Sequence, residues 1–175
     1  MKPVVVAVLV AFAATVASAQ DVRIERSQGF AEIEVADAWL QAIAGRPVPD
    51  GARIATWFGA AVSVVAGDAR VDLDQLGLIA VGRDRDALRI THRSGVLRVV
   101  SDGTPIVIDV AGAILRFVAA DVEFDGGRLR LVRGRVDVDY GTYSRVLTRS
   151  ATITVPGRPG SSVLDGFPAI TPELD

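Results

Sequence analysis

The sequence predicts a single domain of the all-β class. Apolar and polar residues alternate with a period of two through much of the chain, which is the pattern of strands with one buried face. Turn-forming pairs of glycine and aspartate interrupt these runs about every 8–12 residues, and no long stretch shows the 3.6-residue period of a helix. We expect many short strands, arranged either as a two-sheet sandwich or as a short, flattened β-solenoid.

Two kinds of strand follow from the patterns along the chain. Strictly alternating runs predict half-buried strands at residues 31–35, 69–74, 129–131 and 136–139. Continuous apolar runs rich in β-branched residues predict more fully buried strands at residues 60–65, 78–81 and 105–110. Residues 145–155 predict one further strand.

The connections between strands are marked by residues that favour turns. Turns are expected at Gly67-Asp68, Asp102-Gly103 and Gly126-Gly127. Residues 36–44 favour a strand or a turn, with a short helical turn as the alternative. The residues Pro47, Pro49 and Asp50-Gly51 then break the backbone before an extended run resumes at residues 53–56.

The alternation also predicts which side chains form the core. The inward residues are expected to be Ile33, Val35, Trp39, Ile54, Val71, Leu73, Leu88, Ile90, Val107, Leu129, Leu131 and Val136. The polar residues between them, including Glu32, Glu34, Asp72 and Arg130, are expected to face solvent.

The N-terminal residues predict a secretory signal peptide at residues 1–19. A single positive charge at Lys2 precedes an apolar run, and small residues follow at Ala17-Ser18-Ala19. The run is shorter than the ~20 apolar residues that span a bilayer, so we expect cleavage after Ala19 and no stable membrane span afterwards. The expected location is the periplasm or the exterior of a bacterial envelope. An uncleaved membrane anchor is the alternative.

The composition excludes several kinds of protein. The formal net charge is only −2 at pH 7, whereas a general nucleic-acid binder carries an excess of basic residues. Cysteine is absent, so disulfides contribute nothing and stability must come from the hydrophobic core. We expect one β domain at residues 20–140, followed at residues 141–175 by a C-terminal strand and a flexible tail. In that tail, Phe167 and Ile170 are candidates for docking on the domain.

Six residues at characteristic places resemble the motif of a known family. They are Gly29, Trp39, Gly45, Gly51, Ile54 and Thr56, followed by strand-like segments at residues 88–99 and 129–138 that each contain a glycine. In this order they resemble the FecR domain, the periplasmic module of iron-transport regulators, over residues 29–138. The resemblance implies a non-catalytic sensing or interaction module. Because a counterpart of the family's cytoplasmic anti-sigma segment is missing, we expect a stand-alone module that binds an envelope protein or a cell-envelope polymer.

Few residues suggest catalysis, and no cofactor or metal is expected. His92 is the single histidine and lies in a polar run that resembles a turn, where it is expected to be solvated. Carboxylate pairs two residues apart occur at Asp72/Asp74, Asp84/Asp86 and Asp137/Asp139, a spacing that a polar strand face also produces. An envelope hydrolase on a β scaffold, with acids around Asp72–Asp86 and His92, and a structural or surface-assembly protein are the alternative functions.

Two sets of residues are the candidates for binding. Trp57 and Phe58 are consecutive, so on a regular strand they point to opposite faces and one of them is expected to be exposed. Arg128 and Arg130 share a strand face, and with neighbouring arginines they predict a cationic strip for phosphate or carboxylate groups. Cross-strand pairing of these arginines with Asp72, Asp74, Asp137 and Asp139 is the alternative.

Overall fold

The computed structural model describes residues 21–141, 143–148 and 150–155. These residues form fourteen strands and no helix, which confirms the predicted all-β fold in one domain. Within this part of the chain, accordingly, no helix is long and apolar enough to cross a membrane. The predicted signal peptide, and the tail that contains Phe167 and Ile170, lie outside the described residues.

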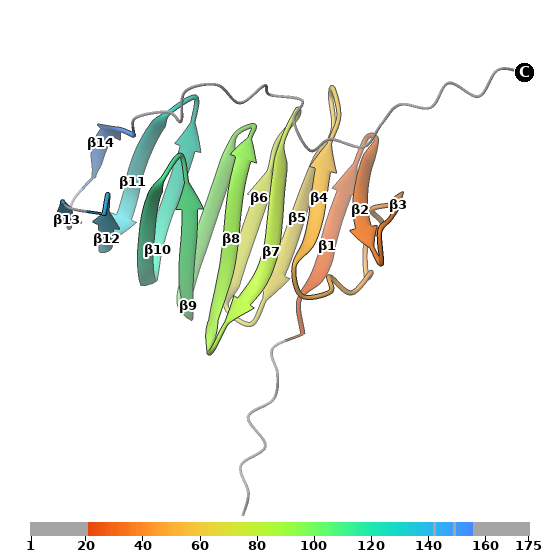
Figure 1. The fold of residues 1–175 in the computed structure, drawn as a ribbon, viewed down its shortest axis with the longest axis horizontal. Coiled ribbons are helices and arrows are strands. Elements are labelled where there is room, and N and C mark those ends of the chain that lie inside the picture. Colours follow the sequence, from red (N-terminus) through yellow and green to blue (C-terminus); the bar gives the residue numbers. More distant parts are fainter. Residues whose placement is uncertain (1–20, 142, 149, 156–175) are drawn as a thin grey trace, which may run out of the picture.

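The fourteen strands form one hydrogen-bonded sheet that curls into two facing layers (Figure 1). In spatial order, layer A consists of β1 (Arg23–Gln28), β5 (Ala61–Ala66), β6 (Ala69–Leu73), the first half of β9 (Leu97–Val110), the second half of β10 (Ala113–Asp125), β11 (Arg128–Gly134) and β14 (Ala151–Thr154). Layer B consists of β3 (Ala38–Gln41), β2 (Ala31–Val35), β4 (Ala52–Thr56), β7 (Leu78–Asp84), β8 (Ala87–Ser94), the second half of β9, the first half of β10, β12 (Val136–Asp139) and β13 (Ser144–Leu147).

The long β9–β10 hairpin belongs to both layers and joins them. The first half of β9 pairs with β6, whereas its second half pairs in parallel with β8. Between the halves, the register with β10 shifts from Phe117 opposite Ile106 to Ala119 opposite Asp102, so β9 has more residues than β10 across the bend. The prediction of a turn at Asp102-Gly103 is therefore wrong, because these residues lie inside β9 at the bend.

Two buried hydroxyl groups satisfy backbone atoms at this bend. The Ser101 hydroxyl donates to the Thr104 carbonyl at 2.7 Å, and the Thr104 hydroxyl accepts from the Asp68 amide at 3.1 Å. The Thr104 hydroxyl also lies 3.3 Å from the carbonyl of Ala66. These bonds connect the bend to the β5–β6 turn. Although the strand pairing is distorted at the bend, every buried polar side-chain atom among the described residues has a hydrogen-bond partner.

The connection after β3 covers the outer edge of β1. Ile24 donates its amide to the carbonyl of Arg46 at 2.9 Å and accepts from the amide of Gly45 at 2.8 Å, and Val48 donates to the carbonyl of Val22 at 2.8 Å. An exposed edge of this kind would pair with another chain. The glycine and proline residues that the sequence marks as backbone breakers therefore close one edge of layer A.

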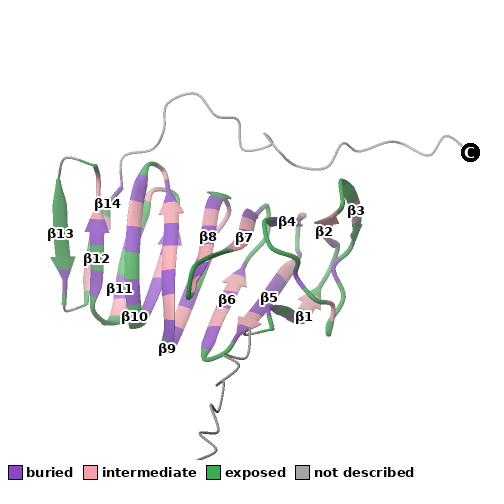
Figure 2. Ribbon diagram, turned by 60° about the horizontal axis from the view of Figure 1, so that its bottom comes forward, coloured by how far each residue is buried: buried purple, intermediate pink, exposed green. Residues whose placement is uncertain are grey.

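The hydrophobic core lies between the two layers. Figure 2 shows buried and exposed bands alternating along the long strands, as the period of two predicts. Nine of the twelve predicted core residues are buried, namely Ile33, Ile54, Val71, Leu73, Leu88, Ile90, Leu129, Leu131 and Val136. Of the four residues predicted to face solvent, Arg130 is exposed, whereas Glu32, Glu34 and Asp72 are half-buried.

Trp39 is a half-buried residue on the outer face of layer B, and its predicted core position is wrong. The β2–β3 turn has two residues with positive φ, Ala36 at 49° and Asp37 at 65°. A two-residue turn of this kind sets the hairpin register, which places Trp39 opposite Glu34 and on its face of the sheet. There the Arg53 guanidinium lies 5.3 Å from the centre of the Trp39 ring and forms an ion pair with Glu34.

Two further core predictions are also wrong. Val107 is only half-buried because its neighbours Ile106 and Ile108 take the inward positions instead. All three residues are apolar, so the alternation there has two equally good registers. Val35 is half-buried as well, because it lies at the end of β2 beside the exposed turn.

We expect Ile54→Ala to lower the free energy of unfolding by about 2–5 kcal/mol, because Ile54 is fully buried and its truncation leaves a cavity. Trp39→Ala should lower the free energy of unfolding clearly less, since it removes mainly surface contacts. Urea unfolding of both variants measures the difference. An equal or larger loss for Trp39→Ala would contradict the register of β3.

Candidate functional site

Three exposed apolar side chains and one half-buried tryptophan lie together at one end of the sandwich. Phe30, Trp57, Phe58 and Leu76, called the end cluster below, lie in the β1–β2, β4–β5 and β6–β7 turns. The exposed fraction is 83% for Phe58, 55% for Phe30 and 38% for Leu76, while Trp57 is half-buried. The prediction that one residue of the Trp57-Phe58 pair is exposed is confirmed, and Phe58 is that residue.

Direct contacts join the three turns of the end cluster. The Trp57 amide donates to the carbonyl of Phe30 at 3.1 Å, and the Leu76 amide lies 3.5 Å from the carbonyl of Trp57. Gly29 has a φ of 70°, and a Cβ there would lie only 2.9 Å from the Cα of Ala60. The β1–β2 and β4–β5 turns therefore approach as closely as backbones can, and only glycine fits at this position.

The Trp57 ring is fixed at both of its ends. Its centroid lies 6.3 Å from that of Phe30 with the planes tilted by 34°, and its Nε1 donates to Glu32 Oε2 at 2.9 Å. A paired indole N–H holds the ring in one orientation. Within the end cluster, Trp57 is thus held in place by side chains of two neighbouring elements.

Thr56 supports this end of the molecule from inside. Its hydroxyl accepts from the Gly77 amide at 2.9 Å and contacts the backbone carbonyl of Asp74. Thr56 and Gly77 are both buried, so the Gly77 amide has no water available as a substitute acceptor. The threonine quoted for the FecR resemblance is therefore a structural link between β4 and the turn that carries Leu76.

Thr56→Val should lower the free energy of unfolding by about 1–3 kcal/mol, because the buried Gly77 amide loses its acceptor at nearly constant side-chain volume. Thr56→Ser keeps the hydroxyl and is the matched control, with a smaller loss that reflects one methyl group. Urea unfolding compares the three proteins. Equal stability of the valine variant and the wild type would show that the turn finds another partner.

Arg128 and Arg130 are exposed on the outer face of β11, far from the end cluster in the layer (Figure 1). The expected uninterrupted cationic strip does not form, because β10 places acids between the arginines. Asp125 lies opposite Arg128, and Glu123 lies between Arg130 on one side and Arg98 on the other. Arg98 in turn forms two hydrogen bonds with Asp121 at 2.8 and 3.0 Å. Acids therefore lie across from both arginines, but they are Asp125 and Glu123 rather than the expected Asp72, Asp74, Asp137 and Asp139.

Four of the six paired carboxylates of the sequence are engaged with arginines. Asp72 accepts from Arg70 and Ser63, Asp84 pairs with Arg89, and Asp137 and Asp139 pair with Arg135 and Arg116. Among the described residues, no three histidine, aspartate or glutamate side chains are close enough to hold a metal ion. Asp72 lies on the outer face of layer A, on β6, whereas Asp84 lies at the end of β7 in layer B. The acids proposed for a hydrolase are therefore not brought together.

His92 is buried in the core, which corrects its predicted place in a solvated turn. It continues the inward alternation of Leu88 and Ile90 along β8, a pattern that extends further than the polar neighbours suggest. Its Nε2 donates to the carbonyl of Gly95 at 2.9 Å, and its ring contacts Phe124 edge-on at 4.9 Å. Burial lowers the pKa of His92 below its usual value, although hydrogen bonds to backbone groups act in the opposite direction.

The unfolding free energy should therefore fall as the pH decreases below about 6.5, the usual pKa of histidine in an unfolded chain. In that range the unfolded chain takes up a proton that folded His92 resists, which costs up to about 1.4 kcal/mol per pH unit until the lowered pKa is reached. His92→Gln removes this titration and keeps a donor. Urea unfolding from pH 7 to pH 5 should give a flatter profile for the variant, and identical profiles would contradict the burial of a neutral His92.

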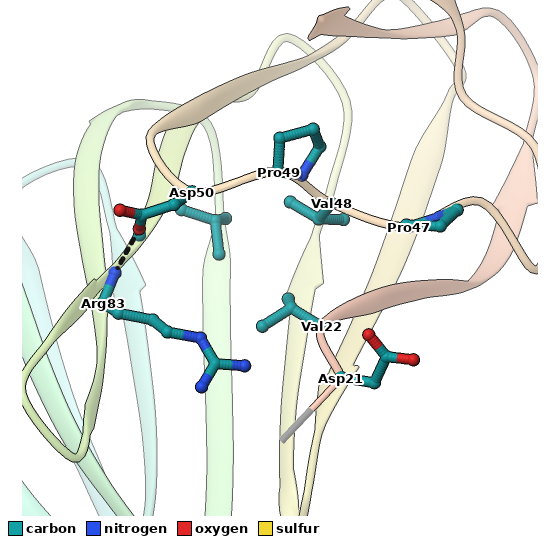
Figure 3. Close-up of a pocket in the computed structure, with 9 residues that line it drawn as sticks. Asp21, Val22, Pro47, Val48, Pro49, Asp50 and Arg83 are labelled. Carbon is teal, nitrogen blue, oxygen red and sulfur yellow. Dashed lines mark hydrogen bonds between the residues drawn. The ribbon is translucent and has the colours of Figure 1, made fainter. Parts of the chain in front are cut away.

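A small cavity of about 140 Å³ lies at the other end of β1 and β7 (Figure 3). Val22, Val48 and two prolines line it, and the Arg83 side chain extends across it toward Val22. Asp50 closes one side by accepting from the Arg83 amide at 2.7 Å. The volume is below the roughly 300–1,000 Å³ of sites that bind small organic ligands. The end cluster is therefore the stronger candidate for function.

No protein-family model matches the chain, and no curated protein matches it either. The FecR-like character thus stays a prediction that rests on the residues of the chain itself. Sequence patterns did not identify Phe30 and Leu76 as members of the candidate site. Their position beside the turn glycines Gly29 and Gly77 is the signal that points to them.

Proposed function

We propose that this chain is a secreted, non-catalytic interaction module of the FecR-like kind and that the end cluster contacts a protein of the bacterial envelope. The observation that carries the proposal is Phe58, a phenylalanine that is 83% exposed beside a second exposed phenylalanine, Phe30. Aromatic side chains gathered on a surface are typical of protein interfaces, where a few of them supply most of the binding energy.

The rigidity of the end cluster supports a binding role. The Gly29–Ala60 approach, the buried Thr56 hydroxyl and the Trp57–Glu32 bond hold the three turns before any partner arrives. A surface that is already ordered loses less conformational entropy on binding than mobile loops do. The cost of keeping two phenylalanines in water is then offset in the complex.

The charges of the molecule favour an apolar contact over an anionic polymer at Arg128 and Arg130. Acids lie directly beside both arginines, so their field is weakened at short range. Binding through the end cluster should accordingly depend little on salt concentration. The proposed periplasmic or secreted location is supported by the signal-peptide pattern at residues 1–19.

We expect a photo-crosslinking amino acid at position 58 to join the protein to one discrete envelope protein in the native bacterium. The same amino acid at Val118, which is exposed at the bend of β10, is the matched control and should give no such adduct. With the purified partner, Phe58→Ala should weaken binding by about 30-fold, the effect of losing a central aromatic contact.

The proposal fails if Phe58→Ala and Phe30→Ala both bind the partner as the wild type does, with their folds intact by circular dichroism. It also fails if crosslinks from positions 58 and 118 yield the same products in similar amounts. In that case the end cluster would be an exposed but unused surface.

A further inference from the structure

The two layers end in an open groove beside the last strands. The groove lies between layer B at β12–β13 and layer A at β14, at the left of Figure 1. Its volume is about 510 Å³, and its lining residues are Tyr140, Tyr143, Arg145, Ile153 and Thr154. Within the described sheet, β13 and β14 each pair with one strand only. These two strands are thus the last strands of their layers in the described sheet.

Arg145 lies on the same face of the edge strand β13 as the buried Leu147, but Arg145 itself is exposed. The register places it opposite Val138, and two residues later Leu147 lies opposite Val136, all three of these apolar residues being buried. An apolar side chain would be expected at such a position. Among the residues that the structure describes, no carboxylate lies within ion-pair distance of Arg145, whereas arginines such as Arg98 and Arg116 pair with acids on the faces of the sheet. Its guanidinium is therefore available to a ligand in the groove.

Two tyrosines lie beside this arginine. The Tyr140 amide donates to the carbonyl of Tyr143 at 2.7 Å, and the two ring centroids are 6.2 Å apart with planes tilted by 36°. Tyr143 is 58% exposed, so one ring face is open to solvent. Burial raises the pKa of Tyr140, and the charge of Arg145, which also lines the groove, acts in the opposite direction. The phenol of Tyr140 therefore stays a neutral hydroxyl donor at physiological pH.

We propose that this groove binds an acidic sugar unit of a polysaccharide, with the sugar ring on Tyr143 and its carboxylate on Arg145. The C–H groups on one face of a sugar ring pack on an aromatic ring, and guanidinium matches a carboxylate with two parallel hydrogen bonds. The phenol of Tyr140 and the hydroxyl of Thr154 are suited to sugar hydroxyls. The volume lies within the range of small-ligand sites.

This inference goes beyond the proposed function, because it assigns a second ligand class to a separate site. It also moves the expected binding of an anionic polymer away from Arg128 and Arg130, where acids are interleaved, to an arginine without such neighbours. The end cluster and the groove lie at opposite sides of the strand order, so one surface can be tested without disturbing the other.

The experiment measures binding of a galacturonic acid trimer, and of the neutral galactose trimer, to the mature protein by titration calorimetry. The acidic trimer should bind at least about tenfold more tightly, and this preference should shrink as salt is added. Arg145→Gln and Tyr143→Ala should each weaken the binding of the acidic trimer by about tenfold or more. Arg130→Gln, an exposed arginine of the other layer, is the matched control and should bind as the wild type does.

Three outcomes would overturn the proposal. The acidic trimer could fail to bind at millimolar concentration, or Arg130→Gln could lose binding while Arg145→Gln keeps it. Alternatively, Arg145→Gln could leave the sugar affinity unchanged and cause concentration-dependent association in sedimentation experiments. Arg145 would then be a charge that protects an edge strand from pairing with another chain. None of these outcomes changes the crosslinking expected at position 58, so the two proposals fail separately.

Discussion

The bend of the β9–β10 hairpin is the constraint on which the rest of the structure depends. One half of β9 continues the ladder of β6 and the other half continues that of β8, so two layers arise from one sheet without a separate linker. The inserted residues of β9 allow this change because they shift the register while Ser101 and Thr104 satisfy the freed backbone groups. If Asp102-Gly103 formed the turn of an ordinary hairpin instead, β9 would not continue from one layer into the other, and the two layers would share no strand.

The bend also determines what the ends of the molecule present to a partner. Because strands of both layers run the full height of the sandwich, their turns gather at common ends, and distant parts of the chain meet there. Phe30, Trp57 and Leu76 come together in this way, each from a different turn. Aromatic side chains are exposed to solvent at this end of the molecule, whereas the core residues of the strands are buried.

The distribution of charge gives the outer faces a common character. Acids and arginines alternate across neighbouring strands, as in Asp72, Arg98, Glu123 and Arg130 along one row. Each exposed pair contributes at most about 1 kcal/mol to stability, but the alternation opposes shifts of register, which would bring like charges together. Arg145 differs from these arginines, because the residue opposite it on the neighbouring strand is the buried Val138 and not an acid.

The sequence by itself determined the class of the fold and most of its strands. The runs at residues 31–35 and 136–139 coincide with β2 and β12, because a period of two is a local property that depends only on neighbouring side chains. It also indicated the exposure of one residue in the Trp57-Phe58 pair. Only the tertiary structure decided which face of an ambiguous strand is inward, as for Val107, Trp39 and His92, because turn geometry and partner strands select the register. The same holds for the end cluster and the groove. Their residues are separated in the chain, and the pairing of strands brings them together.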